Sequence, residues 1–182
     1  KTSLMKPQQF IRLIACVIAG ALWIYLGQNF VLINLLAEPF SGGGMDFTAF
    51  LDTASSPSFI ALWFTCIAVT LIWLTTTSNR SPVNSAEVRE MRRSWWICAS
   101  VLVFLGWFYQ LVFTVLIWQL TGSAPFEGAP GNYFPVPPGG WLTLLVLVIL
   151  DVGLLFWLPT MLATPKSYKL VVPGALKYQG GR

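Results

Sequence analysis

Four long runs of apolar residues divide the chain. An α-helix rises about 1.5 Å per residue, so about 20 apolar residues cross the roughly 30 Å hydrocarbon core of a bilayer. Each run reaches about that length, which predicts an all-α integral membrane protein with four transmembrane helices. The predicted helices cover residues 10–36, 59–77, 95–121 and 141–163.

The segments between the runs are polar or rich in glycine, proline and serine, so we expect them to be loops. They cover residues 38–57, 78–94 and 122–140, and a basic tail follows from residue 164. The first run is longer than the apolar region of a secretory signal peptide, which spans about 7–15 residues. We therefore expect it to be a retained helix.

The distribution of charge predicts the orientation. All 11 Lys and Arg residues lie in the N-terminal segment, the central segment or the tail, or at their boundaries. The other two connecting segments contain none, which is the positive-inside pattern and predicts an N-in, C-in topology. Tryptophans near the ends of the runs fit aromatic belts at the two membrane surfaces. They are Trp95 and Trp96 inside, and Trp118 and Trp141 outside.

Composition agrees with a membrane protein. The chain is 55% hydrophobic and 10% charged, against about 25% charged residues in soluble domains. The net charge of +4 arises from the flanks of the apolar runs, so nucleic acid is not an expected partner. The pattern is typical of a multi-pass protein of a bacterial inner membrane or an equivalent, including a thylakoid-type membrane.

An internal repeat is suggested by a shift of 84 residues. It places Trp23-Ile24-Tyr25 on Trp107-Phe108-Tyr109, and eight of the 25 positions from Arg12 to Leu36 are then identical. The same shift places Trp73-Leu74 on Trp157-Leu158. We therefore predict two tandem-duplicated helical hairpins, residues 1–84 and 85–182, forming a parallel pseudo-repeat.

One ionisable residue lies deep within a predicted span, namely Asp151. An ionised aspartate at a helix centre costs about 2.5–3.5 kcal/mol on insertion scales, so we expect it to be buried away from lipid. Polar groups at a similar depth predict an intramembrane polar cluster. Its other members are Gln110, Gln28, Tyr25 and Tyr109. A neutral structural contact and a titrating transport site both fit this cluster.

Candidate chemistry is otherwise sparse. Histidine is absent, the three cysteines lie within apolar runs, and no catalytic or metal-binding motif occurs, so neither an enzyme nor a metal site is predicted. No cofactor is predicted either. Trp23 and Trp107 are candidate pocket aromatics for a pigment, quinone or lipid, although such residues are more often helix packing.

The C-terminal tail contains apolar residues that a solvated tail rarely keeps together. Leu170, Val171, Val172 and Leu176 are therefore candidate contacts with another membrane subunit. These observations favour a non-catalytic structural or assembly subunit of a larger integral membrane complex. The alternatives are a small transporter or channel component that uses Asp151, and a subunit that binds a pigment, quinone or lipid.

Overall fold

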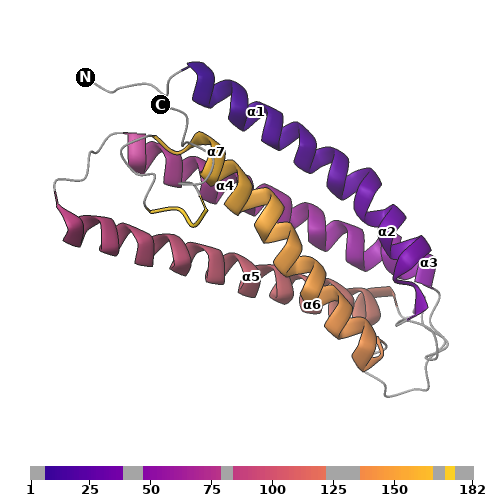
Figure 1. Cartoon of the computed structure of the whole chain (residues 1–182). Helices are drawn as coiled ribbons and strands as arrows, with labels where there is room; N and C mark the ends of the chain where they lie inside the picture. The colour runs from indigo at the N-terminus through magenta and orange to yellow at the C-terminus, as the bar shows by residue number, and fades with distance from the viewer. Residues whose placement is uncertain (1–6, 39–46, 79–83, 122–135, 166–170, 175–182) are drawn as a thin grey trace. The chain divides into compact units, whose positions relative to one another are not determined.

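The computed structural model describes residues 7–38, 47–78, 84–121, 136–165 and 171–174, and every regular element in these ranges is a helix (Figure 1). The first span comprises α1 (Pro7–Leu22), η1 (Trp23–Gly27) and α2 (Gln28–Leu35). The second comprises α3 (Phe47–Phe50), η3 (Leu51–Ser55) and α4 (Ser56–Ser78). The third is α5 (Ser85–Thr121). The fourth comprises α6 (Pro138–Val152), η4 (Gly153–Trp157) and α7 (Leu158–Ala163).

Four helices in these ranges are long and apolar enough to cross a membrane, which confirms the predicted all-α membrane class. They are Gln9–Leu35, Ser56–Thr77, Ser85–Leu116 and Pro138–Ala163. The orientation of these helices and the tandem duplication stay predictions.

The central polar segment is partly helical, so the prediction of a loop throughout residues 78–94 was wrong. Helix α5 begins at Ser85, ten residues before the apolar run. Asn84 caps it, because its Oδ1 accepts a hydrogen bond of 2.9 Å from the backbone N–H of Glu87. Glu87 also places a negative charge in the first turn, where the helix dipole favours it. A polar sequence in this segment therefore does not mean that the helix is interrupted.

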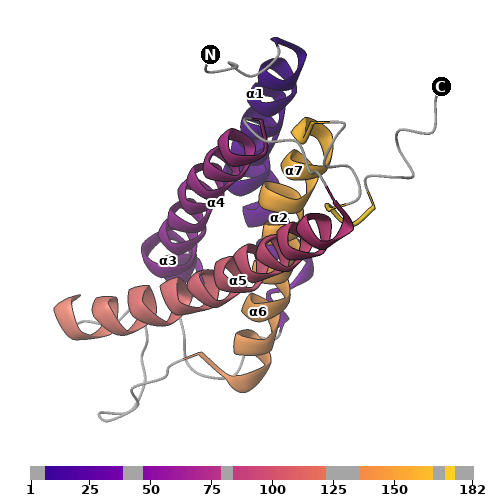
Figure 2. The same cartoon turned by 90° about the vertical axis from the view of Figure 1, so that its left-hand side faces the viewer.

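The helix that contains the second span also begins earlier than predicted, at Phe47. Residues 47–57 belong to the predicted loop, but the chain is continuously helical from α3 through η3 into α4 (Figure 2). Pro57 lies inside this helix, where a proline removes a backbone donor and its ring crowds the carbonyl four residues earlier. The fourth span shows a smaller difference, since α6 begins at Pro138. Proline is favoured at the first helical position because its N–H is not needed there.

Two of the three π-helical turns in the described part of the chain end one residue before the residue that precedes a proline. In η3 the N–H of Ser56 bonds the carbonyl of Leu51, one residue before Pro57. In η4 the N–H of Leu158 bonds the carbonyl of Gly153, one residue before Pro159. Each wide turn gives room for the proline ring while the neighbouring backbone groups stay paired.

The third π-helical turn has a different origin. It contains Trp23, whose ring lies over Gly27 one turn later. A Cβ atom at Gly27 would approach Trp23 Cε3 to 2.7 Å, so glycine provides the space for the indole ring. The positions equivalent by the predicted repeat, Trp107 to Leu111, are ordinary α-helix in α5.

The chain divides into two compact units. Unit 1 comprises Lys1–Gly20, Phe64–Leu102 and Asp151–Arg182, and unit 2 comprises Ala21–Trp63 and Val103–Leu150. Each unit therefore contains segments from both predicted hairpins. The core of unit 1 includes the buried side chains of Leu74, Trp95, Leu102 and Phe156. The core of unit 2 includes those of Leu32, Phe59, Leu62 and Leu144.

Close packing in unit 2 depends on a glycine of α5. A Cβ atom at Gly106 would lie 2.7 Å from Val148 Cγ1 and 2.9 Å from Leu62 Cδ2. Both neighbours are fully buried, and valine has little rotamer freedom, so neither side chain can move aside easily. Gly106 thus allows α4 and α6 to approach α5 closely.

We expect Gly106→Ala to lower the free energy of unfolding by about 1–3 kcal/mol, because the added methyl group overpacks this contact. Gly153→Ala is the matched control, since a Cβ atom there would meet nothing within 4 Å and alanine favours helix. Unfolding of both variants in detergent micelles measures the difference. Equal stability of the two variants would contradict the close packing at Gly106.

Candidate functional site

Asp151 is fully buried in unit 1, with 0% of its surface exposed, which confirms the expected burial. It lies close enough to the buried thiol of Cys66 for the two groups to interact electrostatically. Asp151 is the last residue but one of α6, two residues before the start of the π-helical turn η4.

The other members of the predicted polar cluster lie in unit 2. Gln28 and Gln110 are each only 1% exposed. Both amide atoms of Gln110, Nε2 and Oε1, lack a hydrogen-bond partner among the described residues. Its backbone carbonyl accepts a 2.7 Å hydrogen bond from the hydroxyl of Thr114. Gln110 is therefore a buried polar side chain, and no residue in the described part of unit 2 bonds its amide N–H or C=O.

The two tyrosines differ in exposure. Tyr109 is half-buried, whereas Tyr25 is 52% exposed and meets Trp63 edge-on at a ring-centroid distance of 6.5 Å. The predicted cluster is thus divided, with Asp151 in unit 1 and its four other members in unit 2. Its assembly into one site stays a prediction.

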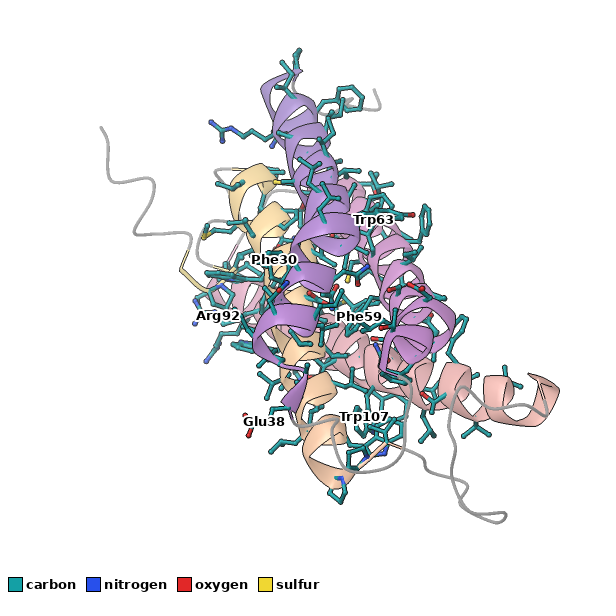
Figure 3. All side chains as sticks on the ribbon, turned by 90° about the vertical axis from the view of Figure 1, so that its right-hand side faces the viewer. Phe30, Glu38, Phe59, Trp63, Arg92 and Trp107 are labelled. Carbon is teal, nitrogen blue, oxygen red and sulfur yellow. The ribbon has the colours of Figure 1, made fainter. Side chains whose placement is uncertain are left out.

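The candidate pocket aromatics have neighbours within unit 2. Trp23 folds over Gly27 of its own helix. Trp107 meets Trp141 at a centroid distance of 5.2 Å and an interplanar angle of 72°, near the beginning of α6 (Figure 3). Both indoles are half-buried. These contacts account for the two residues as helix packing, and a role in a pocket stays a prediction.

A group of hydrogen-bonded tryptophans in unit 1 was not predicted. Trp95 Nε1 donates to Thr160 Oγ1 at 3.1 Å, and its ring stacks on Phe156 at 5.4 Å. Trp73 Nε1 donates to Thr164 Oγ1 at 3.3 Å. Trp95 is only 3% exposed, so its assignment to the aromatic belt was wrong, whereas the adjacent Trp96 is 53% exposed. Trp95 lies on the inward face of α5, whereas Trp96 faces outward. The sequence pattern did not predict which of these two adjacent tryptophans would be buried.

The end of α7 is capped by side chains from α1. Gln9 Nε2 donates to the carbonyl of Ala163 at 3.0 Å, and Arg12 donates to the carbonyl of Leu162 at 3.1 Å. Carbonyls in the last turn have no intrahelical partner, and a positive charge there also complements the helix dipole. This contact gives Arg12 a structural role inside the first apolar run.

The described part of the tail packs on its own chain. Val171 and Val172 are buried in unit 1, and Trp157 Nε1 donates to the carbonyl of Pro173 at 2.7 Å. Gly174 has a φ of 83°, and a Cβ atom there would lie 3.3 Å from Trp157. Burial within unit 1 therefore explains why these two positions are apolar, without a partner protein. The other predicted contacts, Leu170 and Leu176, lie outside the described residues, and contact of the tail with a partner stays a prediction.

The described residues contain no group of three or more Cys, Asp or Glu side chains that could hold a metal ion. Comparison with protein-family models, curated proteins and solved structures finds no match for the chain.

Asp151 offers a direct test of its chemistry. We expect Asp151→Asn to fold and assemble normally, because an amide keeps both a donor and an acceptor. Asp151→Leu removes both and should lower the free energy of unfolding by about 1–2 kcal/mol. Unfolding in detergent micelles measures both variants. Greater destabilisation by asparagine than by leucine would show that the site requires a carboxyl group.

Proposed function

We propose that the chain is a non-catalytic structural or assembly subunit of a larger integral membrane complex. One observation carries this proposal, namely the exposed hydroxyl group of Tyr25 within the first span. The side chain is 52% exposed, and its hydroxyl has no hydrogen-bond partner among the described residues. The depth of Tyr25 within the span decides whether water can bond this hydroxyl.

Tyr25 lies near the middle of its span. The span runs over Gln9–Leu35, so its central residue is Leu22, three residues or about 4.5 Å along the axis from Tyr25. Hydrocarbon offers no hydrogen-bond partner at that depth, and an unpaired hydroxyl is costly there. A helix of another subunit can supply the missing acceptor, as interhelical hydrogen bonds do in membrane proteins.

The surroundings of Tyr25 suit such a contact. Residues of unit 2 on the same helical segment present large exposed apolar side chains, namely Leu22, Leu26, Phe30 and Ile33. The first span is also the least buried of the four, with 17% of its apolar window buried within the chain. Lipid alone can cover these apolar groups, so the hydroxyl is the feature that favours a protein partner.

The remaining parts of the proposal come from the sequence. The distribution of Lys and Arg supports an N-in, C-in orientation in a bacterial inner membrane or an equivalent. The aligned tryptophans support descent from a duplicated hairpin. Partners are expected to be other membrane subunits rather than nucleic acid.

Tyr25→Phe tests the proposal because it removes only the hydroxyl group. Interhelical hydrogen bonds contribute about 0.6–1.7 kcal/mol in membranes, so we expect partner affinity to fall about 3- to 17-fold. The measurement is quantitative co-purification from native membranes in mild detergent. Tyr109→Phe, the same change at a half-buried tyrosine, is the control and should leave co-purification unchanged. A wild-type protein that purifies as a functional monomer would exclude the subunit function.

Deletion of the tail is a less selective test of the same proposal. It would remove Val171 and Val172 from the core of unit 1 and break the hydrogen bond from Trp157 to Pro173. Loss of a partner after such a deletion would therefore not distinguish a lost contact from a damaged unit. The tyrosine pair avoids this ambiguity.

Gln110 favours a second candidate function, the binding of a pigment, quinone or lipid. Its unused amide donor is suited to a ligand carbonyl within the membrane. If this function is correct, organic extracts of the purified protein contain such a molecule, and Gln110→Leu lowers its amount several-fold. Chromatography and absorbance of the extracts measure the ligand. Extracts without a stoichiometric ligand would exclude it.

A further inference from the structure

One face of α5 gathers positive charge where the helix leaves its apolar span. Arg89, Arg93 and Trp96 are spaced four and three residues apart, so they lie along one face of the helix. All three are exposed, and Arg92, also exposed, lies one turn from Trp96 and extends away from the ribbon (Figure 3). We name this surface, formed by Arg89, Arg92, Arg93 and Trp96, the arginine face.

Two acidic residues belong to the same segment. Glu90 lies three residues before Arg93 and so borders the arginine face, whereas Glu87 lies about 160° round the helix from Arg89. Arg89 and Arg93 form no ion pair with any residue in the described part of the chain. Their positive charge is therefore available to an external anion.

The location of the arginine face selects the kind of anion. Trp95 begins the apolar run of α5, so the arginines directly precede the hydrocarbon-crossing part of the helix. The indole of Trp96 is 53% exposed at this boundary, the level at which tryptophans meet lipid headgroups. Lipid phosphates are the anions found at this depth in any bilayer, and arginine pairs with phosphate through two parallel hydrogen bonds.

We propose that the arginine face binds the headgroups of anionic phospholipids. Arg89 and Arg93 pair with the phosphate group, and Trp96 packs against the glycerol and upper acyl region. This binding site goes beyond the proposed subunit function and does not depend on it, since it uses only α5 and the bilayer.

Native mass spectrometry of the detergent-purified full chain tests the proposal by titration with phosphatidylglycerol or phosphatidylcholine. A basic residue near an anionic surface changes affinity about fivefold, so Arg89→Gln with Arg93→Gln should weaken phosphatidylglycerol binding about 10- to 30-fold. The wild type should prefer phosphatidylglycerol over phosphatidylcholine. Higher ionic strength should reduce that preference.

Two control proteins separate this site from a general effect of charge. Arg80→Gln together with Lys6→Gln removes the same net charge at positions outside the described residues and should retain phosphatidylglycerol binding. Arg89→Lys with Arg93→Lys keeps the charge and should retain most of it. Equal binding of the two lipids by the wild type, or unchanged binding by the glutamine variant, would overturn the proposal. A glutamine variant that loses a co-purifying protein while its lipid binding is unchanged would assign the arginine face to an acidic partner and would also overturn it.

Discussion

The pairing of backbone hydrogen-bonding groups is the constraint on which the rest of this structure depends. Hydrocarbon contains no water to pair an open N–H or C=O, and in an all-helical membrane protein each lipid-facing segment pairs these groups within its own helix. Pro57 and Pro159 interrupt that pairing, and a π-helical turn lies just before each of them. Helix ends leave further groups open, and the end of α7 is completed by Gln9 and Arg12 of α1.

Polar side chains in the spans follow the same constraint to different degrees. Hydroxyl groups such as that of Thr77 bond to carbonyls of their own helix, and tryptophans of unit 1 bond to Thr160 and Thr164. Asp151 is removed from lipid by complete burial. Gln110 and Tyr25 depart from the pattern, since the amide of one and the hydroxyl of the other are left without a hydrogen-bond partner in the described part of the chain. A departure of this kind is informative because each unpaired group in hydrocarbon is costly.

The two proposed contacts of the chain, one at Tyr25 and one at the arginine face, are physically independent. Tyr25 concerns the side of a helix within the hydrocarbon, where a hydrogen bond is scarce and a protein helix is a suitable partner. The arginine face concerns the membrane surface, where charge attracts lipid headgroups over a Debye length. A subunit held by both kinds of contact would be fixed laterally by its protein partner and in depth by its lipids.

The sequence by itself indicated the membrane class and the number of helices long and apolar enough to cross a bilayer, because about 20 consecutive apolar residues match the thickness of the hydrocarbon core. It also indicated that Asp151 would be buried, since the cost of exposing a carboxylate to lipid does not depend on the fold. The helical starts at Phe47 and Ser85 were missed because polar and proline-containing segments continue a helix when capping or a wide turn permits it. Only the tertiary structure decided which of two adjacent tryptophans is buried, that Gly106 is a packing site, and that Val171 and Val172 pack on their own chain. Such choices depend on contacts between residues far apart in the chain, which periodicity and composition do not specify.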